Sequence, residues 1–292
     1  CHLPGLVEQI QGPIMFTSVK WRRVSGQVTG ALAVLMGGLF MFAALQRQLI
    51  YYPEVAPEQS LLKTAGGLGL LDWRGPNGQL IGWHTPSTGS ESRRVVVFHG
   101  NAGHSLYRHY FAEGFLALGG DWQVYLFEYP GYGARPGTPS ESAIKAAALQ
   151  AIEALIADGQ QPVYLVGESL GRGVATYLAS SLPHKVAGLL LVTPFTSLAD
   201  VAAGHYRWLP VRALLSDRYD SRAPLDAYVG PVAFLIAGSD EIVPAELGRE
   251  LYSAYRGPKL LREQEGAGHN TLDFDPAANW WREVSNFLLA EP

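Results

Sequence analysis

One pentapeptide constrains the fold of this chain more than any other feature: Gly-Glu-Ser-Leu-Gly at residues 167–171. It follows the apolar run 162–166 and precedes the helix-like stretch 174–180, which gives the order strand, sharp turn, helix. A serine on so tight a turn has a strained backbone that lifts its hydroxyl above the sheet, and the flanking glycines permit the close crossing. The pattern therefore predicts that Ser169 is a nucleophile.

A serine hydroxyl becomes a nucleophile when a histidine takes its proton and a carboxylate orients that histidine. The apolar run 232–237 ends in Gly-Ser-Asp-Glu, which places Asp240 in a loop just after a buried strand; Glu241 beside it is the alternative acid. His269 follows the last strand-like run in a loop rich in glycine. The order Ser169, Asp240, His269 therefore predicts a catalytic triad.

A fourth signal is independent of these three side chains. The strand-like run 94–98 ends in His-Gly-Asn-Ala-Gly at residues 99–103. Acyl-transfer enzymes of this architecture take one oxyanion-binding N–H from the residue after the nucleophile and a second from such a loop. We therefore expect the backbone N–H groups of Asn101 and Leu170 to bind the oxyanion, and His99 to fix the loop.

Six short motifs together carry a family resemblance. They are His-Gly-Asn-Ala-Gly at 99–103, Glu-Tyr-Pro-Gly-Tyr-Gly at 128–133, the pentapeptide at 167–171, Thr-Pro-Phe-Thr-Ser at 193–197, Gly-Ser-Asp-Glu at 238–241 and Gly-His-Asn at 268–270. From about residue 50 to its C-terminus the chain resembles the Bem46-like α/β-hydrolases, which include the ABHD13-like and ABHD17-like proteins. The resemblance implies an α/β-hydrolase sheet, a Ser-Asp-His triad, ester or thioester hydrolysis, and a single membrane anchor near the N-terminus.

Three residues are candidate substrate contacts. Arg172 stands where that family usually has a glycine or another small residue, so its long cation either clashes or contacts an acid group of the substrate. Tyr129 belongs to the second motif. Trp208 lies in the stretch of about thirty residues between Pro194 and Pro224, which is too short for a large lid. That stretch forms either a short cap lining an acyl pocket or a layer that packs a strand onto its helix, and both interpretations stay open.

The fold class expected from the whole pattern is α/β. Strand-like runs alternate with helix-like runs, which predicts a mostly parallel central sheet with helices on both faces. A hairpin at the sheet edge is expected from two runs joined across Gly-Pro-Asn-Gly, at 68–73 and 79–83. The expected strands are 95–98, 124–128, 163–166, 188–192, 232–237 and 259–262, and the expected helices are 105–118, 139–157, 169–181, 245–255 and 276–289.

The N-terminal region contains a second long-range signal. Residues 24–45 carry no charge, and 22 residues at about 1.5 Å each span the roughly 30 Å core of a bilayer. The positive charges of Lys20, Arg22 and Arg23 outnumber Arg47, so the N-terminal side should stay cytoplasmic. We therefore expect a transmembrane signal-anchor and a catalytic domain outside the cytoplasm, in the periplasm if the source is bacterial.

This organisation divides the chain into a cytoplasmic tail at 1–23, the transmembrane helix at 24–45 and a catalytic domain at 50–292. A cleaved signal peptide and a buried domain helix are the competing interpretations of 24–45. Met15 is a natural initiator, which leaves open whether residues 1–14 belong to the native protein.

Other functional classes have little support. The net charge is −4 and the pI about 6.1, without the basic patch that nucleic acid binding needs. Neither nucleotide-binding glycine motif occurs, the remaining histidines lack metal-ligand spacing, and a single cysteine cannot form an intramolecular disulfide. We expect no metal and no cofactor.

The function predicted from the sequence is hydrolysis of a carboxylic ester or thioester through an acyl-enzyme. The partners expected are a small-molecule acyl substrate and, through the N-terminal helix, a membrane. Three alternatives stay open: a peptidase or amidase on the same fold, an acyltransferase, and a membrane-tethered interaction protein without catalysis.

Overall fold

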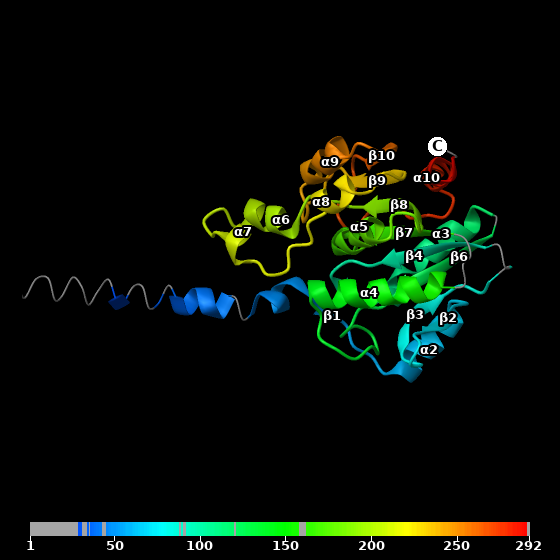
Figure 1. Ribbon diagram of the computed structural model, residues 1–292, viewed down its shortest axis with the longest axis horizontal. Helices are drawn as coiled ribbons and strands as arrows, with labels where there is room; N and C mark the ends of the chain where they lie inside the picture. The colour runs from blue at the N-terminus through cyan, green and yellow to red at the C-terminus, as the bar shows by residue number, and fades with distance from the viewer. Residues whose placement is uncertain are drawn as a thin grey trace, which may run out of the picture. The chain divides into compact units, whose positions relative to one another are not determined.

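The computed structural model describes residues 29–30, 34, 36–42, 45–87, 89, 92–119, 121–157 and 162–290. The chain divides into two compact units, Cys1–Ala44 and Leu45–Pro292. In the first unit the described residues are helical, and the second unit contains the sheet (Figure 1).

An eight-stranded sheet forms the centre of the second unit, in the order β10-β9-β8-β7-β4-β6-β3-β2. The first six strands of this order, from β10 across to β6, each pair in parallel with the next. Strand β3 pairs antiparallel with both of its neighbours, β6 and β2. The mostly parallel sheet and the antiparallel hairpin at its edge are thus confirmed. The strands are β2 Leu71–Arg74, β3 Leu80–His84, β4 Arg93–Phe98, β6 Trp122–Phe127, β7 Val163–Glu168, β8 Val186–Val192, β9 Val232–Ala237 and β10 Lys259–Gln264.

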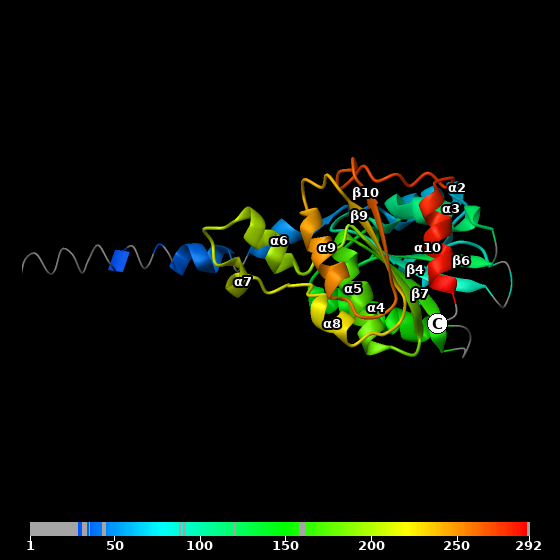
Figure 2. The ribbon, with the colours of Figure 1, turned by 90° about the horizontal axis from the view of Figure 1, so that it is seen from above.

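Helices cover both faces of this sheet. Helices α3 and α10 lie on one face, and α4 and α5 lie on the other (Figure 2). Every residue of β6 and of β9 is buried, as expected for central strands of a parallel sheet with helices on both sides. The helices are α2 Glu58–Gly67, α3 His109–Ala117, α4 Glu141–Ile156, α5 Arg172–Ser181, α9 Ala245–Ala254 and α10 Asn279–Leu289.

Helix ends differ from the sequence prediction for local reasons. Helix α4 begins at Glu141 rather than 139, because the hydroxyl of Ser140 accepts the N–H of Ala143 and caps the helix. The helix expected at 105–118 is divided into a 3₁₀ turn, η1 Ser105–Arg108, and α3. The helix expected from 169 likewise opens with a 3₁₀ turn, η2 Ser169–Gly171, ahead of α5.

The stretch between β8 and β9 contains three short helices: α6 Leu198–His205, α7 Val211–Leu214 and α8 Arg222–Asp226. Val201 packs with Phe195 and Val243 in a small cluster of its own, so part of this stretch is a packing layer. Trp208, in contrast, is 82 % exposed.

None of the helices in the described part of the chain is both long and apolar enough to cross a membrane. Half of the predicted anchor at 24–45 lies outside the described residues. The membrane helix therefore stays a prediction.

Candidate active site

The turn between β7 and α5 holds Ser169 in a left-handed conformation, with a φ of 50°. Such a backbone costs a residue other than glycine about 1–3 kcal/mol, and this cost is usual at active sites. Both glycines of the motif are needed for space. A Cβ on Gly171 would lie 2.0 Å from the carbonyl oxygen of Phe98, and one on Gly167 would lie 2.4 Å from the Cα of Arg172.

The fold brings the three predicted side chains together. His269 Nε2 lies 3.1 Å from Ser169 Oγ, and His269 Nδ1 lies 2.6 Å from Asp240 Oδ2. The Asp240 side chain is 2 % exposed and that of His269 is 11 % exposed. Because an ionised carboxylate only accepts, Nδ1 carries the proton and the lone pair of Nε2 faces the serine hydroxyl.

The alternative acid Glu241 has a different position. Its carboxylate accepts the backbone N–H of His269 at 3.3 Å and does not bond to the imidazole ring. The carboxylate of Asp240 is held on the side away from His269, since its Oδ1 accepts the N–H groups of Ile242 and Val243 at 2.9 and 2.7 Å.

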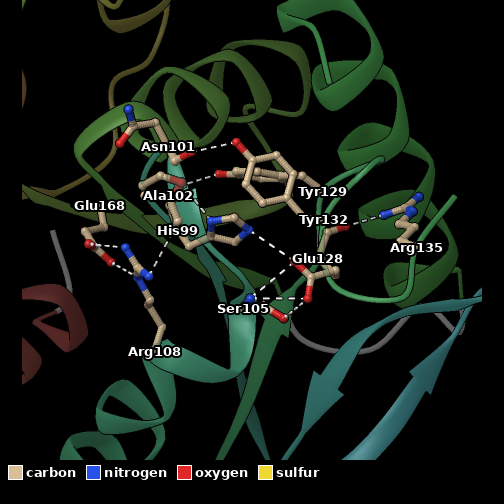
Figure 3. A network of polar contacts seen from close by, with 11 residues as sticks. His99, Asn101, Ala102, Ser105, Arg108, Glu128, Tyr129, Tyr132, Arg135 and Glu168 are labelled. Atoms are coloured by element: carbon tan, nitrogen blue, oxygen red, sulfur yellow. Dashed lines mark hydrogen bonds and ion pairs between the residues drawn. The ribbon is translucent and has the colours of Figure 1, made fainter. Parts of the chain in front are cut away.

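The loop after β4 passes close to Ser169. A Cβ on Gly100 would lie 3.7 Å from the Cβ of Ser169. The carbonyl of Gly100 accepts a hydrogen bond from Nδ1 of His99 at 2.7 Å, and Nε2 of His99 lies 3.4 Å from Glu128 Oε1 (Figure 3). His99 is buried and fixes this loop from below, as the sequence suggested.

Tyr129 also supports the loop instead of lining an open pocket. Its side chain is fully buried, and its hydroxyl donates to the carbonyl of His99 at 2.7 Å (Figure 3). The structure therefore does not support a substrate contact for Tyr129. Its hydroxyl is occupied by a backbone acceptor, and burial raises the pKa of Tyr129 well above its usual value.

Arg172 has a structural position as well, contrary to the suggested substrate contact. It is fully buried and donates to the carbonyls of Phe195 and Tyr219 at 2.5 and 2.8 Å. Its guanidinium lies 3.3 Å from the centre of the Phe195 ring. Burial lowers the pKa of Arg172 to about 9. The cation avoids a clash because these backbone acceptors and the ring surround it.

An ion pair at Glu168, the residue before Ser169, was not expected from the sequence. Arg108 donates to both oxygens of Glu168, from Nε at 2.9 Å and from Nη2 at 3.1 Å (Figure 3). The Tyr110 hydroxyl donates to the same carboxylate at 3.1 Å. Burial would raise the pKa of Glu168, but the charge and hydrogen bonds of Arg108 outweigh it and hold the pKa below its usual value. No motif links residues 108 and 168, so only the fold could reveal this pair.

Within the described residues, no three His, Cys, Asp or Glu side chains gather where they could hold a metal ion. The arrangement of Ser169, His269 and Asp240 can remove a proton from the hydroxyl and return it without a cofactor. A mostly parallel sheet with helices on both faces and a strained serine turn at the end of a central strand is the architecture of the α/β-hydrolase fold.

The chain belongs to the alpha/beta hydrolase family. The family described as alpha/beta hydrolase fold matches residues 93–222. The chain is 40 % identical over 251 residues to uncharacterized protein Rv2307c of Mycobacterium tuberculosis, covering 83 % of this chain and 87 % of that one.

More distant relatives carry functional names. Lysophosphatidylserine lipase ABHD12 of Danio rerio is 32 % identical over 241 residues, which cover 75 % of this chain and 60 % of the relative. The Macaca fascicularis protein of that name is 30 % identical over 210 residues, or 65 % of this chain and 52 % of the relative. The chain thus spans about half to three fifths of these lipases. The narrower resemblance to Bem46-like proteins stays a prediction.

Solved structures show the same fold. An esterase of Pyrococcus furiosus superposes with a TM-score of 0.62 at 17 % identity, over 82 % of this chain and 96 % of the esterase. A monoacylglycerol lipase of Paleococcus ferrophilus superposes with a TM-score of 0.53 at 22 % identity, over 72 % of this chain and 98 % of the lipase. At this identity the similarity establishes the fold alone.

Proposed function

We propose that this protein is a serine hydrolase that cleaves a carboxylic ester or thioester through an acyl-enzyme. The observation that carries the proposal is the continuous hydrogen-bonded series from Asp240 through His269 to Ser169, at 2.6 and 3.1 Å. Structural packing does not require a strained serine, a buried aspartate and a histidine in this order.

In the proposed reaction, Ser169 Oγ attacks the carbonyl carbon while His269 Nε2 takes the hydroxyl proton. Asp240 keeps the imidazole in the tautomer with a proton on Nδ1 and stabilises the imidazolium that forms. His269 then gives the proton to the leaving alcohol or thiol. A water molecule, activated by the same imidazole, releases the acid and restores Ser169.

The oxyanion that forms in each step is assigned to the backbone N–H groups of Leu170 and Asn101. Leu170 follows the nucleophile at the start of a helix, where the free N–H groups carry partial positive charge. Asn101 follows Gly100 in the loop after β4, and a Cβ on Gly100 would lie 3.7 Å from the Cβ of Ser169. Oriented donors of this kind contribute about 10²–10³ to kcat each.

The substrate class that the relatives support is a lipid ester. The zebrafish and macaque relatives are named as lipases of lysophosphatidylserine, and they share 30–32 % identity with this chain. A single acyl chain esterified to a polar alcohol is therefore the first substrate to test. We also retain the proposal that residues 24–45 anchor the enzyme in a membrane with the catalytic domain outside the cytoplasm.

The test uses the full chain in detergent with p-nitrophenyl esters of increasing acyl length, an acyl thioester, an acyl anilide and a lysophospholipid. We expect the wild type to hydrolyse esters and thioesters. Ser169→Ala should abolish this turnover and leave the circular dichroism spectrum unchanged.

Ser180→Ala is the matched control and should stay active. Ser180 is a half-buried serine in α5, the helix that follows Ser169, and its hydroxyl donates to the carbonyl of Tyr177. Full ester turnover in Ser169→Ala would refute the proposal, and cleavage of the anilide alone would indicate an amidase.

A further inference from the structure

The chain enters the hydrolase unit through a short segment that contacts the active-site loops. Its extended part, β1 Tyr52–Pro53, pairs in parallel with β5 Ala102–Gly103, and these two strands form a small sheet separate from the main one. We call residues 46–54 the N-terminal strap. The strap follows directly after the uncharged stretch that ends at Leu45.

The first contact of the strap is with Asn101, the residue assigned as an oxyanion donor. Asn101 Nδ2 donates to the carbonyl of Ile50, and the N–H of Tyr52 donates to the carbonyl of Asn101, both at 2.9 Å. The hydroxyl of Tyr132 donates to the same carbonyl at 2.7 Å (Figure 3). The side chain and the carbonyl of Asn101 are therefore both held by groups outside its own loop.

The N–H of Asn101 belongs to the peptide plane that also contains the carbonyl of Gly100. That carbonyl accepts a hydrogen bond from His99 Nδ1 at 2.7 Å (Figure 3). His99 thus holds this plane directly, because a trans peptide moves as a rigid unit. The strap holds the side chain of Asn101 and, through the Asn101 carbonyl, the next peptide plane, which meets the first at the Asn101 Cα. Loss of either support lets the N–H turn away from the oxyanion.

The second contact of the strap is with the support of the nucleophile helix. The hydroxyl of Tyr51 donates to Asp217 Oδ2 at 2.7 Å and lies 2.9 Å from the hydroxyl of Tyr219. Nε of Arg47 lies 3.3 Å from the same Asp217 oxygen. Tyr51, Asp217 and Tyr219 are all buried.

Tyr219 continues this connection to α5. Its backbone has a left-handed φ of 45°, and its carbonyl accepts Nη2 of Arg172, the first residue of the helix that follows the nucleophile turn. A Cβ on Gly173 would lie 2.9 Å from atoms of the Tyr219 side chain, so the ring packs directly on the start of α5. Three consecutive strap residues, 50 to 52, therefore hold Asn101 directly and the start of α5 through Tyr219.

We propose that the N-terminal strap is a positioning element of the catalytic site, which holds the N–H of Asn101 and the start of α5 in the geometry that binds the oxyanion. This inference rests on the proposed serine hydrolase function. Because the bonds to Asn101 come from backbone groups of the strap, Asn101 and Tyr51 are the side chains through which it can be tested.

The test compares Asn101→Ala and Tyr51→Phe with the wild type, all as full chains. We expect kcat to fall about tenfold, a part of the 10²–10³ lost with a whole oxyanion donor, while KM stays within about twofold. The affinity of an alkyl boronic acid, which forms a tetrahedral adduct on Ser169, should fall by the same factor. The affinity of the product carboxylate should fall less, because it is planar and forms no tetrahedral adduct on Ser169.

Tyr228→Phe is the matched control. Tyr228 is as buried as Tyr51, and its hydroxyl donates to the carbonyl of Val186 at the start of β8, the end of the sheet opposite Ser169. It should lower the melting temperature without changing kcat or boronic acid affinity.

Three outcomes overturn the inference. One is unchanged kcat and boronic acid affinity in folded Asn101→Ala. Another is an equal fall in carboxylate and boronic acid affinity. The third is the same kinetic change in Tyr228→Phe. If Tyr51→Phe does not fold, the kcat and the boronic acid affinity of Asn101→Ala alone test the inference. Retained activity in Ser169→Ala would instead refute the underlying function, so the two failures are distinguishable.

Discussion

The two carboxylate oxygens of Asp240 have different partners, and this division determines the tautomer of His269. Oδ1 accepts two backbone N–H groups from the loop that follows, so the carboxylate cannot rotate. Oδ2 faces the imidazole and accepts its Nδ1–H. A buried carboxylate fixed in this way favours the imidazolium that the proposed reaction forms.

Asp240→Asn should leave the fold intact and lower kcat about 10³–10⁴-fold, because an amide donor facing Nδ1 favours the wrong tautomer. Steady-state kinetics on a p-nitrophenyl ester measures this directly.

Glu241→Gln provides the matched control and decides between the two candidate acids. Its carboxylate is exposed and bonds only to the backbone N–H of His269 within this loop, so kcat should change by no more than about threefold. A larger loss in Glu241→Gln than in Asp240→Asn would show that the acid has been assigned to the wrong residue.

At the scale of elements, the nucleophile turn crosses the end of β4 with almost no space between the two backbones. Gly171→Ala would place a methyl group 2.0 Å from the Phe98 carbonyl, so the two elements must separate. We expect a loss of more than about 3 kcal/mol in the free energy of unfolding, measured by urea denaturation.

Gly66→Ala is the control for the glycine substitution itself. Gly66 lies in α2, and no atom approaches the position of its Cβ within 4 Å. Because alanine has the higher helix propensity, the free energy of unfolding should rise by about 0.5–1 kcal/mol. Equal effects at both positions would contradict the close crossing at Gly171.

The ion pair between Arg108 and Glu168 joins η1 to the end of β7. Arg108→Gln leaves a largely buried carboxylate without its cation, and should cost about 3 kcal/mol in the free energy of unfolding at neutral pH. Arg249→Gln, which breaks a more exposed pair with Glu263, should cost less than about 1 kcal/mol.

The difference in the free energy of unfolding between wild type and Arg108→Gln should depend on pH, because the pKa of Glu168 is lowered in the folded protein. Since the folded-state pKa lies below the unfolded value of about 4.3, the contribution of the pair is present above that value and is lost as the pH falls through the folded pKa. The gap between wild type and Arg108→Gln should therefore narrow below about pH 4 in urea titrations. A gap that widens there would contradict the ionised pair.

Much of the element arrangement could be predicted from the sequence, because apolar runs and turn residues are local signals. The parallel strands, the edge hairpin and the order of Ser169, Asp240 and His269 are examples. The burial of Arg172 could not be predicted, because its acceptors at Phe195 and Tyr219 are carbonyls of residues distant in sequence. The pairing of the strap with the Asn101 loop has no side-chain pattern either, since backbone groups make most of its bonds.

For the whole molecule, the proposed anchor at residues 24–45 predicts that the full chain sediments with membranes and resists extraction by alkaline carbonate. Replacing Leu35 and Leu39 by arginine should release it, since each charge costs about 2.5–3.5 kcal/mol at the centre of a membrane helix. Recovery of the unaltered chain in the soluble fraction would contradict the anchor. It would leave the proposed hydrolase chemistry untouched, because the triad lies entirely within the unit Leu45–Pro292.

The most direct test of the central claim is to locate the covalent adduct after the full chain reacts with a fluorophosphonate, by mass spectrometry of its peptides. We predict one adduct on Ser169 Oγ, absent from Ser169→Ala and formed much more slowly in Asp240→Asn. A folded chain that forms no adduct, or one modified at another residue while Ser169→Ala retains its ester turnover, would contradict the assignment of Ser169 as the nucleophile.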